Sequence, residues 1–141
     1  MKMKFEDIQE AFDFVNFVAY GEHVAVLDKS TGRIYKHSEL GDFEPIPDRV
    51  LESIDVVEIP HKNDLGLGQE LVFEFVRREI PDDYEAVRTI FKRRGAYAQY
   101  KYLLQSKGLL QRWYDFYIAR QEKALRKWGE ENGVETDRSG R

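Results

Sequence analysis

Two of the three histidines are the residues whose type and spacing first suggest chemistry, because imidazoles commonly ligate metals. His23 and His37 flank a stretch typical of a short hairpin turn, so their side chains are expected near each other at its open end. Zinc would need a third ligand, such as Glu22 or Glu39, and neither stands at the spacing of a recognised zinc motif. The sequence therefore predicts neither a metal site nor a bound cofactor.

Catalysis and phosphate binding find little support among the other polar residues. The carboxylates are many, but none forms a recognisable acid–base pair, and no serine stands in a nucleophile elbow. The glycines of GLGQE (66–70) open an expected helix, but the P-loop lysine is missing and acidic neighbours would repel an anion. The chain has no cysteine, which excludes thiolate chemistry and disulfides. A non-catalytic function is predicted, with an enzyme of unknown type as the third alternative.

The stretch RRGAYAQYK (93–101) interleaves basic and aromatic residues, as grooves for single-stranded nucleic acid do. It also suits a junction between two helices, because Gly95 can end one helix and cations are favoured in its last turn. On the next helix, Tyr97 and Tyr100 share one face with apolar residues, which predicts that they belong to the core. Lys101 and Tyr102 point elsewhere and become candidate binding residues.

The last expected helix carries the main candidate surface. At about 100° per residue, its basic residues fall within a stripe roughly 120° wide, and Phe116 lies among them. An aromatic ring between arginines can stack on a base or contact a partner protein. The alternative is that Phe116 packs on a neighbouring helix while carboxylates of the same chain pair with the arginines. The full set of candidates is Arg112, Phe116, Arg120, Lys123, Arg126 and Lys127, with Lys101 and Tyr102.

Charge is distributed unevenly along the 141 residues. The net charge is −4, but residues 1–81 carry −8 and residues 82–141 carry +4. Residues 88–127 contain 11 basic residues and two acidic ones, a balance of +9. Such a division is typical either of an anionic partner or of two halves that attract each other. The overall negative charge weakens long-range attraction to nucleic acid.

Hydrophobic periodicity predicts one α+β domain over residues 1–133, followed by a flexible polar tail at 134–141. A helix is expected over about 5–19, and then a small antiparallel sheet made of a hairpin around 28–32 and a third strand at 55–60. The sheet is expected to pack with four helices, over about 67–80, 82–95, 96–106 and 109–132. Asp82 is the expected N-cap of the second of these, and Gly133 is expected to end the last.

Four sequence segments, taken together, point to a known family: AVLDKSTGRIY (25–35), LGLGQELVFEFV (65–76), IPDDYEAVRTIFKRRGAYAQYKYLL (80–104) and GLLQRWYDFYIARQEKALRKW (108–128). Together they resemble a bacterial family of uncharacterised proteins, the UPF 0158 type, over about residues 20–133. Tyr97 and Tyr100 stand where many relatives have Phe. The resemblance implies a single fold and a cytoplasmic location, and it brings no activity, cofactor or catalytic residue.

The amino terminus and the hydropathy also bear on location. MKMKFEDIQEAF lacks the apolar core of a signal peptide, and no stretch approaches the roughly 18 apolar residues of a membrane span. We therefore expect a cytoplasmic protein without a membrane partner. The predicted function is a binding or regulatory module that contacts an unidentified protein partner through the basic stripe. The alternative is nucleic-acid binding through the same stripe, and the oligomeric state stays open.

Overall fold

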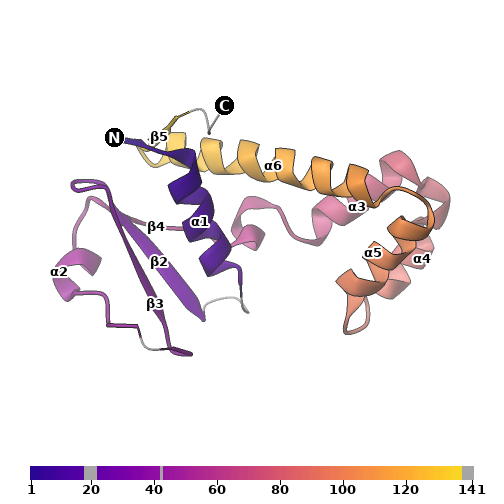
Figure 1. Cartoon of the computed structure of the whole chain (residues 1–141), viewed down its shortest axis with the longest axis horizontal. Coiled ribbons are helices and arrows are strands. Elements are labelled where there is room, and N and C mark those ends of the chain that lie inside the picture. The colour runs from indigo at the N-terminus through magenta and orange to yellow at the C-terminus, as the bar shows by residue number, and fades with distance from the viewer. Residues whose placement is uncertain (18–21, 42, 138–141) are drawn as a thin grey trace. The chain divides into compact units, whose positions relative to one another are not determined.

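The computed structural model describes residues 1–17, 22–41 and 43–137, and it shows the α+β fold that the sequence predicts (Figure 1). The chain forms two compact units: Met1–Leu65 with Lys123–Arg141, and Gly66–Glu122. The long helix α6 (Leu110–Glu131) contributes residues to both. In the part that the structure describes, no helix is long and apolar enough to cross a membrane. The single domain over residues 1–133 stays a prediction.

The first unit contains the predicted antiparallel sheet, with strand order β3-β2-β4. β2 (His23–Asp28) and β3 (Arg33–Ser38) form the hairpin, and β4 (Val56–Glu58) pairs with the other side of β2. The Asp28 carboxylate accepts hydrogen bonds from the hydroxyl and the backbone N–H of Ser30, at 2.6 and 3.0 Å. The hydroxyl contact holds the pKa of Asp28 below its usual value. Gly32, with φ of 78°, completes the turn and leaves β3 at one edge of the sheet.

Helix α1 (Phe5–Val15) covers one face of this sheet (Figure 1). It is shorter than the sequence predicts, because the Asn16 side chain donates a hydrogen bond to the carbonyl of Phe12 at 2.8 Å. The same side chain accepts the backbone N–H of Lys62 at 2.8 Å, which fixes Asn16 outside the helix. The expected end of the helix, at residues 18 and 19, lies outside the described residues.

The opposite face of the sheet is covered by the segment that contains α2 (Asp48–Leu51). Val50 and Ile46 pack there with Val26, and Tyr35 of β3 joins them. A 3-10 turn, η1 (Lys62–Leu65), follows β4. Both faces of the short sheet are therefore occupied, while no further strand among the described residues pairs with its β3 edge.

The two ends of the described chain meet in the first unit. β1 (Lys2–Met3) pairs in parallel with β5 (Glu135–Thr136). Val134 is buried, and the Asp137 carboxylate accepts the backbone N–H of Phe5 at 2.8 Å, at the start of α1. The structure thus differs from the predicted flexible tail at residues 134–137, because a buried valine and backbone pairing hold them. Residues 138–141 lie outside the described residues.

The second unit is helical, as predicted. It contains α3 (Gln69–Glu79), the 3-10 turn η2 (Pro81–Asp83), α4 (Tyr84–Ile90), α5 (Ala96–Ser106) and the first part of α6. The Asp82 N-cap prediction is wrong: Pro81 opens a 3-10 turn, so Asp83 is the residue before α4. Because α4 ends at Ile90, the basic residues 92–94 follow the helix instead of lying in its last turn.

Aromatic side chains form the core of the second unit. Tyr100 is fully buried, with its ring 5.1 Å from that of Trp113 and 5.6 Å from that of Phe91. Gly95 has φ of 70° and connects α4 to α5 without a side-chain clash. The core interpretation of RRGAYAQYK is thus confirmed at Tyr100, and Gly95 makes the expected turn.

Candidate binding surfaces

The first half of the predicted stripe packs against α3 in the second unit. Arg120 makes a two-pronged contact with the carboxylate of Glu74, with its Nη1 donating to Oε1 at 2.9 Å. Arg112 pairs with Glu79 at 3.0 Å. Phe116 lies between these arginines and contacts Phe75 of α3, with ring centroids 5.4 Å apart. This geometry matches the alternative in which carboxylates of the same chain occupy the arginines.

Arg120 also covers the face of Phe116, with its guanidinium carbon 4.9 Å from the ring centroid. The guanidinium carbon of Arg78 on α3 lies 5.7 Å from the centroid of the same ring, and Arg78 pairs with Glu74 as Arg120 does. The ring is partly buried, and the cations beside it belong to the second unit itself. A base or a partner side chain would have to displace one of these contacts to stack on Phe116.

The second half of the stripe belongs to the first unit. Arg126 donates hydrogen bonds to the hydroxyl of Thr136 at 2.9 Å and to the carbonyl of Asp137 at 2.6 Å. Its guanidinium also lies over the ring of Phe5, 4.4 Å from the centroid. Arg126 therefore holds the C-terminal segment, whereas Lys123 and Lys127 are exposed. As a binding surface, the stripe stays a prediction.

Lys101 and Tyr102 lie on α5, as the helical spacing predicts. Tyr102 is 76% exposed, and the Lys101 ammonium lies over the ring of Tyr114, 5.6 Å from its centroid. Ile118, one turn further along α6, is 61% exposed. On a helical wheel, Tyr114 and Ile118 lie beside the residues of the core face, yet both side chains are exposed in the structure. The sequence does not indicate whether an apolar residue at the border of a buried helical face is itself buried or exposed.

The two histidines of the hairpin do not form a site together. In the β2–β3 register, Val24 is paired with His37 and His23 with Ser38. Neighbouring positions on paired strands point to opposite faces, so the two imidazoles lie on different sides of the sheet. His23 Nδ1 lies 2.7 Å from the carbonyl oxygen of Phe14, and His37 Nδ1 lies 3.2 Å from that of Glu44. Among the described residues, no cluster of three potential metal ligands is found.

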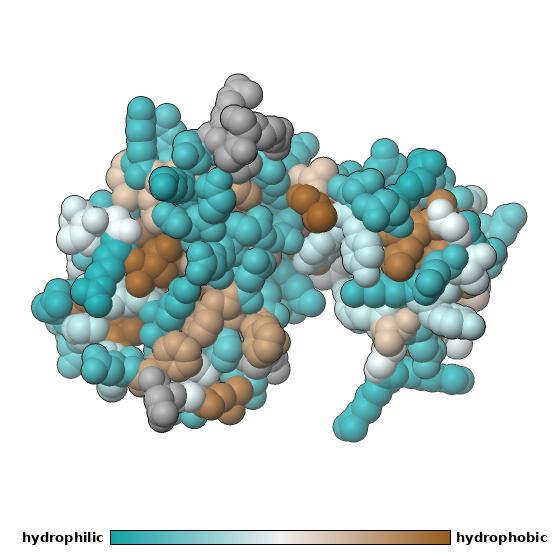
Figure 2. Space-filling view, viewed as in Figure 1, coloured by the Kyte–Doolittle hydropathy of each residue, from teal (hydrophilic) through white to brown (hydrophobic). Residues whose placement is uncertain are grey.

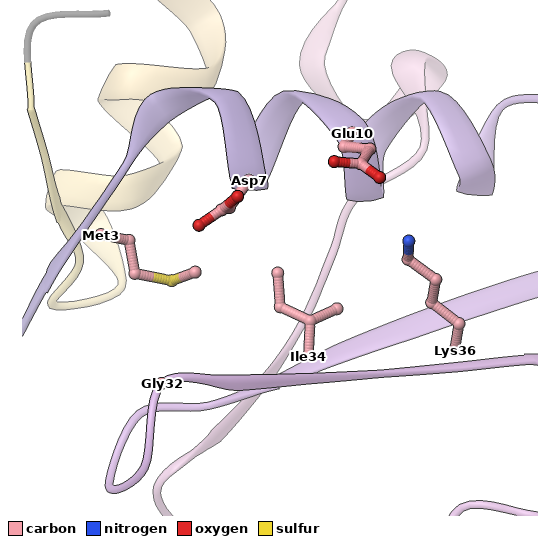
Figure 3. A pocket seen from close by; sticks show the side chains of 6 residues that line it. All are labelled: Met3, Asp7, Glu10, Gly32, Ile34 and Lys36. Carbon is pink, nitrogen blue, oxygen red and sulfur yellow. The ribbon is translucent and has the colours of Figure 1, made fainter.

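A groove that the sequence did not predict opens between α1 and β3 in the first unit. Its volume is about 350 Å³. Asp7 and Glu10 extend from α1 toward it, and Ile34 and Lys36 extend from β3 on the opposite side (Figure 3). Met3 and Gly32 complete the lining at the end near the hairpin turn. The groove thus has an apolar floor between carboxylates on the helix and an ammonium group on the strand.

The groove residues are positioned by regular secondary structure. Asp7 and Glu10 are three residues apart on α1, a spacing that places them on the same side of the helix. Ile34 and Lys36 are two residues apart on β3 and therefore share one face of the sheet. The first turn of α1 is in turn fixed by the Asp137 contact to Phe5. A helix and a hydrogen-bonded strand therefore form the two sides of the groove.

β3 forms the floor of the groove and the outer edge of the sheet. It is hydrogen-bonded to β2 alone in the strand order β3-β2-β4. Within the described ranges, no backbone hydrogen bond joins residues 34–38 to any segment other than β2. In an antiparallel edge strand, about half of the main-chain N–H and C=O groups point outward. These groups are available beside the groove.

Aromatic residues lie close to Lys36, at one end of the groove. Phe14 of α1 stacks on His23, with ring centroids 4.3 Å apart, and contacts Phe43 edge-on at 5.4 Å. The Lys36 ammonium lies 5.6 Å from the Phe14 ring centroid. Lys36 makes no salt bridge within the described part of the chain. The ring face gives this charge a weak favourable contact, and the carboxylate of Glu10 lines the same groove.

The groove offers shape, charge and main-chain hydrogen bonds, and no arrangement for covalent chemistry. The lining side chains include no nucleophile activated by a neighbouring base. On the face drawn in Figure 2, hydrophilic side chains predominate and the apolar side chains form small separate patches. Recognition at this groove would therefore depend on backbone pairing and charge more than on apolar area.

No protein-family model, curated protein or solved structure matches the chain. The resemblance to a bacterial family of uncharacterised proteins stays a prediction.

Proposed function

We propose that this protein is a non-catalytic protein-binding module whose recognition site is the groove between α1 and β3. The observation that carries the proposal is an open groove of about 350 Å³ beside an edge strand. An extended segment of a partner can add to such an edge as a further strand. Main-chain hydrogen bonds then supply affinity, and the groove selects the side chains that face it.

The dimensions of the site suit an extended segment. β3 has six residues, which matches the usual length of a strand in a stable sheet. The added strand would lie about 4.8 Å from β3, and every second side chain would point toward α1. The groove is at the lower end of the range for ligand pockets, roughly 300–1,000 Å³, and so has room for one or two side chains.

A display experiment with matched variants tests this function. Random decapeptides would be selected on the immobilised protein, and the amide exchange of the bound complex measured residue by residue. We expect selected peptides to slow exchange of the outward amides of β3. Ile34→Trp, which fills the groove, should abolish binding, whereas Arg33→Trp on the other face of the same strand should not. Peptides that bind equally well to the Ile34→Trp variant would contradict the proposal.

Nucleic-acid binding is the second candidate, and one observation favours it. Lys92, Arg93 and Arg94 are exposed where the chain leaves α4, and Tyr102 on α5 is exposed as well. Basic groups and a flat ring on the second unit are therefore accessible to a single strand. Unlike Arg112 and Arg120, these three basic residues form no salt bridge within the described ranges.

Titration with single- and double-stranded oligonucleotides at several salt concentrations tests this second candidate. Log affinity should fall linearly with log salt, and Arg93→Glu/Arg94→Glu should make the slope shallower by about 2. Lys123→Glu/Lys127→Glu is the matched variant on the predicted stripe, and it should leave the slope unchanged. A larger effect of that second variant would assign binding to the stripe. The absence of any binding at low salt would contradict both versions.

A further inference from the structure

We infer that the groove selects an extended segment that carries a basic and an acidic side chain two residues apart. This inference rests on the proposed function, since it requires a partner strand on the outer edge of β3. It goes further because it names the chemistry of the partner. The charges that line the groove, and their order along β3, carry the inference.

The basic side chain of the partner would occupy the position next to Ile34 on the added strand. On an added strand, a residue opposite Ile34 and facing α1 would lie about 5 Å from it, Cβ to Cβ. The aliphatic part of Lys or Arg would then cover Ile34 and Met3, which line the floor. Its charged end would point toward the carboxylate of Asp7 on α1, which Figure 3 shows at the Ile34 end of the groove, while Glu10 lies nearer Lys36. Arg can bind such a carboxylate through two parallel hydrogen bonds.

The acidic side chain of the partner would occupy the position next to Lys36 on the added strand. Two residues further along the added strand, the next side chain that faces α1 would lie opposite Lys36. Lys36 contacts the ring of Phe14 but makes no salt bridge in the described part of the chain. A carboxylate there would pair with its ammonium, whereas a second basic residue would be repelled. Because Ile34 and Lys36 are two residues apart on β3, the two preferences together require a basic and an acidic residue two positions apart in the partner.

A second copy of the chain is a poor occupant of this edge. β3 has the sequence RIYKHS, with basic residues and no carboxylate. Pairing two such strands edge to edge would bring like charges together, and charged edge residues are a common means of preventing that pairing. The acidic residues of α1 and the basic residues of β3 instead complement a strand that carries both signs.

Short peptides test the inference on the full-length protein. Each octapeptide would be acetylated and amidated, with Thr and Val as background. One pair carries Lys and Glu two residues apart, in both orders, because parallel and antiparallel addition reverse the order. Two reference peptides are used. One carries two Lys residues at that spacing, and the other carries no charged residue. Fluorescence anisotropy gives relative affinities, and amide exchange of β3 reports whether the peptide lies on the edge.

We expect one Lys/Glu peptide to bind about fivefold more tightly than either reference at low salt, with protected β3 amides. Lys36→Glu should reverse the preference, so that the peptide with two Lys residues binds most tightly. Asp7→Asn/Glu10→Gln should remove the preference for Lys. Lys127→Glu, an exposed charge change on α6, is the control and should change nothing.

The outcomes separate the two claims. If charged and neutral peptides protect β3 with equal affinity, the charge inference is overturned while the proposed function stands. If no peptide in the set protects β3, both are overturned. If Lys36→Glu weakens all peptides equally, the variant has altered the edge and the charge inference fails. A reversal of preference that Lys127→Glu does not reproduce would support it.

Discussion

The hydroxyl of Tyr100 is an unusual feature of the second unit. Tyr100 is fully buried, and its oxygen has no hydrogen-bond partner within the described residues. Burial raises the pKa of this phenol well above its usual value. A buried hydroxyl without a partner costs stability because it has lost its hydrogen bonds to water.

Tyr100→Phe should therefore raise the free energy of unfolding by about 1 kcal/mol, because the ring is kept and the unpaired hydroxyl is removed. Urea denaturation of the two proteins measures the difference. Tyr97→Phe is the matched control: this tyrosine is only partly buried, so a gain of that size is not expected. A Tyr100→Phe protein less stable than the parent would show that the hydroxyl has a bonding partner.

His61 is expected to make the stability of the first unit dependent on pH. It is buried, and burial lowers the pKa of its imidazole below the ordinary value of 6.5. Its Nδ1 accepts the backbone N–H of Asn63 at 3.1 Å, so this nitrogen is unprotonated in the fold. The unfolded chain then binds the proton at a higher pH than the folded chain does.

The free energy of unfolding should therefore decrease as pH falls below about 6.5, toward the lower pKa of the folded protein. His61→Gln cannot take up that proton, so its stability should change less between pH 7 and pH 5. Urea denaturation at intervals across this range checks the difference. Equal pH profiles for the two proteins would exclude His61 as the source.

Residue roles were predictable from the sequence where helical spacing decides them. The spacing on α5 placed Tyr100 in the core and Tyr102 outside it, as the structure has them. The sequence did not predict which residues pair with Arg112 and Arg120, because a helical wheel describes one helix and not the carboxylates that face it. Asp7 and Glu10 gave no signal, since acidic residues on an exposed helical face usually only contact solvent.

At the scale of elements, the end of α6 depends on a close approach between glycine and backbone. A Cβ atom on Gly129 would lie 2.7 Å from the carbonyl oxygen of Val134. The Val134 backbone N–H donates to the carbonyl of Gly129 at 2.6 Å, so the chain folds back tightly onto the helix. Gly133, with φ of 75°, makes the turn between them.

Gly129→Ala should lower the free energy of unfolding by about 2 kcal/mol, although alanine favours helices by about 1 kcal/mol. The added methyl group must push the segment from Val134 onward away from α6. Glu130→Ala, at the exposed neighbouring position, is the control and should change stability by less than about 0.5 kcal/mol. Thermal denaturation followed by circular dichroism distinguishes the two. A Gly129→Ala protein as stable as the parent would contradict the close contact.

Elements with a long periodic pattern were predicted well. The expected helix at 96–106 coincides with α5, and the expected last helix differs from α6 by one residue at each end. β1 and β5 were not predicted, because strands of two residues show no alternation. The early end of α1 was missed for a different reason: Asn16 acts through contacts with Phe12 and with Lys62, which is distant in sequence.

At the scale of the whole molecule, Asp137 joins the two ends of the described chain. Its carboxylate caps the first turn of α1, where Lys4 at the N-cap position offers no side-chain cap. Asp137→Ala should therefore cost about 1 kcal/mol and speed amide exchange at the start of α1. Asp137→Asn keeps an acceptor oxygen and should cost less. Equal losses in both variants would point to a role other than capping.

The overall architecture was predictable only in part. Composition and periodicity gave the α+β class and the order of the elements, because each depends on local patterns. The groove depends on how α1 lies across β3, and these elements are separated by a turn and a strand. No pairing rule within a single sequence specifies that contact. The groove therefore depends on the packing of segments that are distant in sequence, which local patterns do not specify.

The discontinuous first unit has a consequence for the order of folding. Its N-terminal part leaves the ribosome early, but β5, the buried Val134 and the Asp137 cap are synthesised more than 120 residues later. The helices assigned to Gly66–Glu122 are complete before that. During translation, α1 must remain without its cap and β1 without its partner until residues 134–137 emerge. Biosynthesis thus leaves the incomplete first unit exposed for the longest time, and chaperones would have most opportunity to act there.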